Sequence, residues 1–170
     1  GEYYSYDERG NPEGNWRRVD ALSGPQAFLI ERAYDSLDRP IAITYPDGET
    51  VDYHYNDRGL LEAIPGFLVS LSYLPSGQLE NEHIANGVVC NRSYNERQWL
   101  VHLRSEIPAI NNALQDYTYE FDGVGNVRAI TDALGFDEDA ASADQLFTYD
   151  ALYRLTGAQS PAYGALTYRY

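Results

Sequence analysis

The chain has 170 residues, a formal net charge of −14 at neutral pH and 12 basic residues, all of them arginine. This balance excludes the basic patches that bind nucleic-acid phosphates, and it disfavours docking to an anionic membrane surface. The single cysteine excludes an intrachain disulfide framework. The length suffices for one domain, which we expect to bury roughly 70% of its extended-chain surface.

A short pattern recurs along the sequence: an aromatic residue, then Asp or Asn, and Gly three residues after that. We call the aromatic residue of each of the seven copies the anchor and number the residues that follow from it, with the anchor as position zero. Neighbouring anchors are 18 to 28 residues apart, a period typical of repeat architectures. The repeat residues are Tyr6, Asp7, Gly10, Tyr34, Asp35, Tyr55, Asn56, Gly59, Tyr73, Gly77, Tyr94, Asn95, Phe121, Asp122, Gly125, Tyr149 and Asp150.

Each column of the pattern has a physical reason. A second aromatic residue often stands two positions before the anchor, as in Tyr53 and Tyr55, and this spacing puts both rings on one face of a strand. Asp or Asn at position one bonds to nearby backbone N–H groups and begins a turn. Gly at position four supplies a positive φ, and an apolar residue at position six starts the return strand. Each copy therefore predicts a β-hairpin.

In chain order, the copies predict seven hairpins joined by connections of different length. Residues 21–30, 106–116 and 132–145 are predicted insertions in these connections. The first favours a short strand or turn, and the second favours an irregular or briefly helical segment. One hairpin cannot bury its own face, so we expect consecutive antiparallel hairpins side by side in a curved sheet, an all-β fold. Residues 1–170 are predicted to be a single repeat region.

The sequence predicts no catalytic, cofactor-binding or metal-binding residues. His54, His83 and His102 lack metal-ligand spacing, and Cys90, in the strand-like run 87–90, is predicted to be a buried, inert thiol. The acidic residues of the third insertion lack the Gly and terminal Glu of a calcium loop, which favours a solvated segment. They are Asp137, Glu138, Asp139 and Asp144.

The pattern resembles the YD repeats of the Rhs family, in which Tyr-Asp at a turn is followed by Gly-Asn or Leu-x-Arg and an apolar strand. The family includes bacterial Rhs toxins, the B and C components of insecticidal toxin complexes, and teneurins. The stretches that carry the resemblance are Tyr34-Asp35-Ser36-Leu37-Asp38-Arg39-Pro40, Tyr119-Glu120-Phe121-Asp122-Gly123-Val124-Gly125-Asn126 and Phe147-Thr148-Tyr149-Asp150-Ala151-Leu152-Tyr153-Arg154-Leu155.

The resemblance implies a segment of a β-sheet strip that spirals into a hollow shell and, in bacterial members, encloses a C-terminal toxin. The chain has no Asp-Pro dipeptide, so the family's self-cleaving site does not carry over. The chain also has no Met, and it begins and ends within repeats. We therefore expect a piece of a longer, secreted or cell-surface bacterial protein.

Two functions remain open at this stage. The first is a structural shell segment whose partners are the rest of the shell and an enclosed polypeptide. The alternative is an extracellular adhesion module that binds glycan or protein through exposed aromatic residues such as Trp16 and Trp99. No feature favours an enzyme, nucleic-acid binding or membrane insertion. Because a lone segment would expose two sheet edges and an aromatic face, we expect it to need a partner or neighbouring segment.

Overall fold

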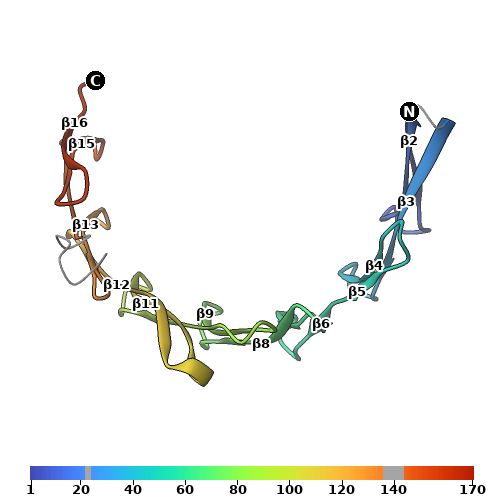
Figure 1. Ribbon diagram of the computed structural model, residues 1–170, viewed down its shortest axis with the longest axis horizontal. Coiled ribbons are helices and arrows are strands. Elements are labelled where there is room, and N and C mark those ends of the chain that lie inside the picture. Colours follow the sequence, from blue (N-terminus) through green and yellow to red (C-terminus); the bar gives the residue numbers. More distant parts are fainter. Residues whose placement is uncertain (22–23, 136–143) are drawn as a thin grey trace. The chain divides into compact units, whose positions relative to one another are not determined.

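The computed structural model describes residues 1–21, 24–135 and 144–170, and its regular structure is almost entirely antiparallel β-strand (Figure 1). The chain divides into two compact units, residues 1–70 and residues 71–170. Within each unit, strands pair with their neighbours in the chain, so consecutive hairpins follow one another as the sequence predicts. Among the described residues, no helix is long and apolar enough to cross a bilayer.

The first unit contains a five-stranded sheet and a separate two-stranded hairpin. The sheet order is β1 (Glu2–Tyr6), β2 (Pro12–Ala21), β3 (Gly24–Tyr34), β4 (Pro40–Thr44) and β5 (Thr50–Asp52). The hairpin consists of β6 (His54–Tyr55) and β7 (Leu61–Ala63). The next strand, β8 (Leu68–Tyr73), contains the point at which the chain passes from one unit to the other.

The second unit continues from β8 in a sheet whose nine strands also follow chain order. Its only described helical element is a single 3-10 turn, η1 (Pro108–Ile110), between two of these strands. The further strands are β9 (Leu79–Ile84), β10 (Val89–Tyr94), β11 (Leu100–Ile107), β12 (Asn112–Phe121), β13 (Val127–Asp132), β14 (Gln145–Tyr149), β15 (Leu155–Ser160) and β16 (Gly164–Thr167).

Every turn that follows an anchor has the same backbone geometry. In the first copy, the N–H of Gly10 donates to the carbonyl of Asp7, and the N–H of Asp7 donates to the carbonyl of Asn11. The anchor then pairs with position six of its own repeat, as in Tyr6 with Pro12, after a one-residue shift of register. This is a hairpin with a tight turn and a bulge, as predicted from the Asp and Gly columns.

Position four is left-handed in all seven copies, including the three that lack Gly. Its φ is 90° at Gly10 and 100° at Gly125, and it is 59° at Asp38, 65° at Gln98 and 61° at Tyr153. The left-handed region is unfavourable for residues with a Cβ, so these three turns keep their geometry at a local cost. The repeat therefore specifies a backbone conformation, and Gly is its least strained solution.

The predicted insertions need one correction. Residues 21–30 were assigned to a connection, but β2 and β3 extend through most of this segment in unbroken register from Gly14 opposite Glu31 to Ala21 opposite Gly24. The long spacing of this repeat thus reflects longer strands. Residues 106–116 contain η1 between β11 and β12, which fits the expected brief helical segment. Part of the third insertion, residues 136–143, lies outside the described residues.

The sheets have little hydrophobic core. Among the described residues, the buried apolar side chains are those of Val51, Cys90, Ala129 and Ala158, and no large side chain is fully buried. The accessible surface is 11493 Å², whereas a compact domain of this mass exposes roughly 8,400 Å². The expected burial of roughly 70% is therefore wrong; the observed area corresponds to roughly 60%. A single layer of strands explains the difference, because in the described parts of the chain substantial contacts occur only between elements that are neighbours in sequence.

The left-handed turns without Gly predict a stabilising substitution. Gln98→Gly should raise the free energy of unfolding by about 0.5–1 kcal/mol, because it removes the strain of a Cβ at positive φ. Urea denaturation of the chain and the variant measures this difference. Glu96→Gly, two residues earlier in the same turn, is the matched control and should stabilise nothing. A Gln98→Gly variant that is less stable than the parent would contradict the account.

Candidate functional site

The seven anchor turns form the most regular feature of the surface, and we call them the YD turns. They connect β1 to β2, β3 to β4, β6 to β7, β8 to β9, β10 to β11, β12 to β13 and β14 to β15. In an antiparallel meander, every second connection falls at the same edge of the sheet. Within each unit, the YD turns therefore follow one another along one edge.

In six of these seven turns, all but the Tyr73 copy with its Leu74, an Asp or Asn at position one holds the turn through its side chain. Its Oδ1 atom accepts two backbone hydrogen bonds, one from position three and one from position five, in all six copies that have Asp or Asn. In the second copy, Asp35 accepts from Leu37 at 2.8 Å and from Arg39 at 3.0 Å. The other five copies repeat this pair at Asp7, Asn56, Asn95, Asp122 and Asp150.

The second side-chain atom at position one distinguishes Asp from Asn. In the four Asp copies, Oδ2 accepts a hydrogen bond from an Asn or Arg side chain at position five. The pairs are Asp7 with Asn11, Asp35 with Arg39, Asp122 with Asn126, and Asp150 with Arg154. The two Asn copies have Leu60 and Trp99 at position five, which donate no side-chain hydrogen bond there. Position five thus donates a side-chain hydrogen bond where Asp at position one offers a second acceptor oxygen, and donates none where Asn stands there.

These contacts lower the pKa of the turn aspartates. Side-chain hydrogen bonds from Arg39 and Asn126 are the main cause at Asp35 and Asp122, respectively. Backbone hydrogen bonds from position five are the main cause at Asp7 and Asp150. All four carboxylates are therefore ionised at neutral pH, and their charge strengthens the hydrogen bonds that close the turns.

In four repeats, the anchor hydroxyl connects the hairpin to the preceding one. The Oη atom of Tyr55 donates to the carbonyl of Pro40 at 2.8 Å, and Pro40 is position six of the preceding repeat. The same bond joins Tyr34 to Pro12, Tyr94 to Leu79 and Tyr149 to Val127. Burial raises the pKa of Tyr55, Tyr73 and Tyr149, so these phenols remain protonated at neutral pH. The preference for Tyr over Phe at the anchors is the only sequence signal for this bond.

Position five also contacts the ring of the next anchor. The Arg39 guanidinium lies 4.3 Å from the ring centre of Tyr55. The Arg154 guanidinium lies 4.7 Å from the ring centre of Tyr170, which stands where an eighth anchor would fall. Where the next anchor is Phe121, which has no hydroxyl, the ring of Trp99 packs against it with centroids 5.1 Å apart. Trp99 was expected to be exposed; it is half-buried by this contact because position five faces the next hairpin.

Side chains of one YD turn also contact the next YD turn directly. The Arg9 guanidinium at position three donates to the Ser36 carbonyl at 2.8 Å and pairs with Asp38 at 3.1 Å. The Arg97 guanidinium makes the equivalent bond to the Gly123 carbonyl at 2.7 Å. Exposed ion pairs of this kind contribute little alone, but a repeated set fixes the spacing of neighbouring turns.

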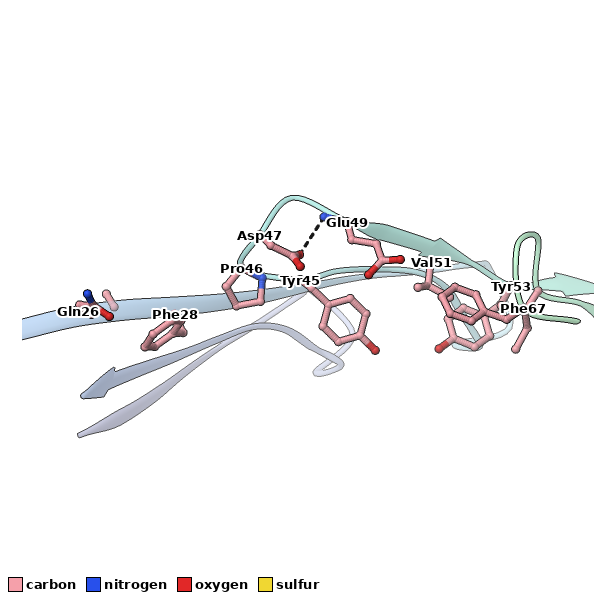
Figure 2. A pocket seen from close by; sticks show the side chains of 11 residues that line it. Gln26, Phe28, Tyr45, Pro46, Asp47, Glu49, Val51, Tyr53 and Phe67 are labelled. Atoms are coloured by element: carbon pink, nitrogen blue, oxygen red, sulfur yellow. Dashed lines mark hydrogen bonds between the residues drawn. The ribbon is translucent and has the colours of Figure 1, made fainter. Parts of the chain in front are cut away.

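We call the strand face that carries the anchor rings, such as Tyr55 and Tyr53 two residues before it, the anchor face. A groove of about 1020 Å³ lies on this face of the first unit. Figure 2 shows the rings of Phe28, Tyr45 and Tyr53 on the same side of the strands, with Tyr45 beside the β4–β5 turn and Phe67 near Tyr53. Its residues are Gln26, Ala27, Phe28, Tyr45, Pro46, Asp47, Glu49, Val51, Tyr53, Ile64 and Phe67. Sequence analysis did not predict this groove, because its residues come from strands whose register the repeat pattern alone does not give.

The polar side chains that could serve catalysis or metal binding either lie apart from one another or already have a hydrogen-bond or ion-pair partner. His54 and His83 are exposed, and the His102 Nε2 atom lies 2.6 Å from Asp116, which also pairs with Arg104. Cys90 is buried and accepts a hydrogen bond from Ser105 at 3.0 Å.

No group of three or more His, Cys, Asp or Glu side chains suited to a metal ion occurs in the described part of the chain. Residues 137–139 lie outside that part, and the described Asp144 accepts a hydrogen bond from the Asp132 N–H. Within each unit, the linked hairpins form a regular sheet surface, and the exposed aromatic rings of the groove can contact a partner.

The sequence is similar to repeat-containing toxin subunits. A family model described as RHS Repeat matches residues 34–64. Toxin subunit YenC1 of Yersinia entomophaga is 37% identical over 168 residues, which cover 88% of this chain and 17% of that protein. Toxin subunit YenC2 of the same organism is 35% identical over 97 residues, which cover 52% of this chain and 10% of that protein. The chain thus spans less than a fifth of the length of these relatives.

Solved toxin structures contain the same fold. A crystal structure of TcdB2–TccC3 superposes with a TM-score of 0.79 at 22% identity, over 92% of this chain and 9% of that one. A Tc holotoxin pore from Photorhabdus luminescens gives a TM-score of 0.76 at 22% identity, over 89% of this chain and 8% of that one. At this level of identity, the likeness concerns the fold of the repeats.

The hydroxyl bond between repeats predicts a specific loss of stability. Tyr149→Phe should lower the free energy of unfolding by about 1 kcal/mol, because the Val127 carbonyl loses its partner while the ring remains. Thermal and urea denaturation measure the difference. The control is Tyr153→Phe, which removes an exposed hydroxyl and should change stability little. Equal effects of the two substitutions would exclude the bond as a source of stability.

The turn aspartates predict a dependence of stability on pH. Because folding lowers the pKa of Asp122, its contribution is fully present above the unfolded Asp pKa of about 4 and is lost as pH falls through the lower folded pKa. Asp122→Asn should therefore destabilise the chain at pH 7, and this difference should shrink below about pH 4. Melting temperatures across this range test the expectation. Asp57→Asn, at an exposed position two of another YD turn, is the control and should change stability little at pH 7.

Proposed function

The chain belongs to the Rhs/YD-repeat family, and from this premise we propose that it is a wall segment of a β-shell that encloses a polypeptide cargo, with a C-terminal toxin as that cargo. The repeats are structural: each contributes a hairpin and the contacts that attach the next one. The seven copies over residues 1–170 act as one repeat region in this proposal. The wall acts by exclusion, because it separates the enclosed polypeptide from its targets until release.

The observation that carries the proposal is a single-layered sheet with an uncovered aromatic face. Half-buried or exposed rings and aliphatic side chains lie on the anchor face, and among the described residues no second layer covers them. Exposed apolar area of this extent marks a surface that contacts something else. An enclosed, incompletely folded polypeptide would supply many weak contacts of the right chemistry for amphipathic Tyr rings.

The wall also needs mechanical continuity, and the YD turns supply it. Tyr34, Tyr55, Tyr94 and Tyr149 bond to the preceding repeat through their hydroxyls, and Phe121 packs against Trp99. Such nearest-neighbour contacts let a strip grow by repetition without a central core. The partners in this proposal are the remainder of the shell, its cargo and the other subunits of a toxin complex. The location is outside the cell, by secretion or at the cell surface.

The adhesion alternative receives less support from the aromatic residues it would need. Trp99 packs against Phe121 and under the Arg97 guanidinium, so its ring is not free for a glycan. Trp16 remains exposed, beside the exposed ring of its cross-strand partner Tyr3, on the face opposite Tyr4. Two rings on one hairpin are a narrower basis for recognition than the many rings of the anchor face, which favours the wall segment.

A structure of the complete polypeptide that contains this segment tests the proposal directly. We expect cryo-electron microscopy to show a closed cavity walled by these repeats, with density for enclosed polypeptide on the anchor side. Limited proteolysis should leave the enclosed segment intact until the shell is opened. An open sheet without a cavity, or a cargo domain that is cleaved as rapidly as in isolation, would contradict the proposal.

A further inference from the structure

The groove on the first unit adjoins a second groove on β1, β2 and β3, half of whose lining residues are polar or charged. Phe28 lines both, and the second is completed by Glu2, Asn15, Arg17, Val19 and Ile30. Phe28 is 41% exposed and Phe67 is 51% exposed, whereas Val51, which also lines the groove, is 7% exposed. Large aromatic residues are thus presented to solvent beside a buried Val51, an arrangement that suits a binding groove.

The charge of the groove restricts what can occupy it. Two carboxylates, those of Asp47 and Glu49, stand beside the rings at the β4–β5 turn, and none of the residues that line the groove is basic (Figure 2). The Asp47 Oδ1 atom accepts the Glu49 N–H of its own turn at 3.1 Å, an interaction that leaves its negative charge uncompensated. The groove therefore combines an apolar surface with an unneutralised negative rim.

This combination argues against several occupants. A second copy of the chain, docked through the same face, would place carboxylates opposite carboxylates in a protein of net charge −14. Phosphate groups and anionic lipid surfaces meet the same repulsion. An apolar polypeptide segment that also carries Arg or Lys has the complementary chemistry, since its side chains can cover the rings while its cations approach the rim.

We propose that this groove, centred on Phe28, Tyr45 and Phe67 with Asp47 and Glu49 at its rim, binds an extended polypeptide segment in which apolar residues alternate with Arg or Lys. The proposal deepens the wall function and rests on it, because the enclosed cargo would supply the segment. The groove thus acts as a local holding site that favours cationic, amphipathic stretches of the cargo over acidic ones.

The test is a binding titration of the full 170-residue chain with short fluorescent peptides, followed by anisotropy. The first peptide alternates Leu or Phe with Arg, the second replaces each Arg by Glu, and the third replaces each Leu or Phe by Ser. We expect the first to bind at least tenfold more tightly than the other two, and to weaken as salt is raised, because screening reduces the attraction of the exposed rim. Equal binding of the Arg and Glu peptides would overturn the proposal.

Substitutions locate the site. Phe28→Ser should weaken binding of the Arg peptide about fivefold, as expected for loss of part of a buried aromatic contact, and Glu49→Gln should weaken it about twofold. Leu146→Ser removes an exposed apolar side chain from the other unit, and Glu62→Gln removes an exposed carboxylate outside the groove. Neither control should change affinity. Should Phe28→Ser disturb folding, seen as a lost cooperative melt, Phe67→Ser takes its place.

The outcomes separate this inference from the wall function. A closed shell with enclosed density, combined with peptide binding that ignores Phe28 and Glu49, would refute the groove and leave the wall intact. Groove-dependent binding in a protein without a cavity would refute the wall and assign the groove to an external peptide. Displacement of the peptide by a neutral oligosaccharide would overturn the proposal in favour of glycan binding.

Discussion

The bond from the anchor hydroxyl to the backbone carbonyl of the preceding repeat is the interaction on which the rest of the structure depends. A single layer of strands has almost no interior, and here the buried apolar side chains are few and small. Stability must therefore come from contacts between neighbouring hairpins. The Tyr55–Pro40 and Tyr149–Val127 bonds supply them with a fixed direction and register. The Trp99–Phe121 contact shows that ring packing replaces the bond where the hydroxyl is missing.

This construction explains how one face can remain available for function. The polar requirements of six of the seven hairpins are met at the turn by Asp or Asn, and in three copies position five contacts the ring at the next anchor position. The anchor face beyond the turns does not need to be filled by a second layer. In the first unit, it carries an apolar groove with an acidic rim. A wall built in this way can present different local chemistry along its length while its turns stay the same.

Much of this was predictable from the sequence, and the reasons are local. The hairpins follow from short-range chemistry, because Asp35 or Asp122 bonds within its own turn. The left-handed backbone at Gln98 follows only from alignment with the Gly-containing copies. A short strand or turn was expected near Gly24-Pro25, whereas β2 and β3 continue through the segment as one long hairpin. The hydroxyl bonds, the position of Trp99 and the groove depend on which residues face each other between strands, and a repeat pattern does not contain that information.

Native-state hydrogen exchange of the chain, followed residue by residue, tests most directly whether repeat contacts rather than a core carry the fold. The account predicts that the slowest amides in each unit are those at the YD turns, including Arg39 and Asn126, and that the opposite turns at Gly48 and Gly87 exchange faster. Slowest exchange centred on the buried residues Val51, Cys90, Ala129 and Ala158, with rapid exchange at the YD turns, would contradict it.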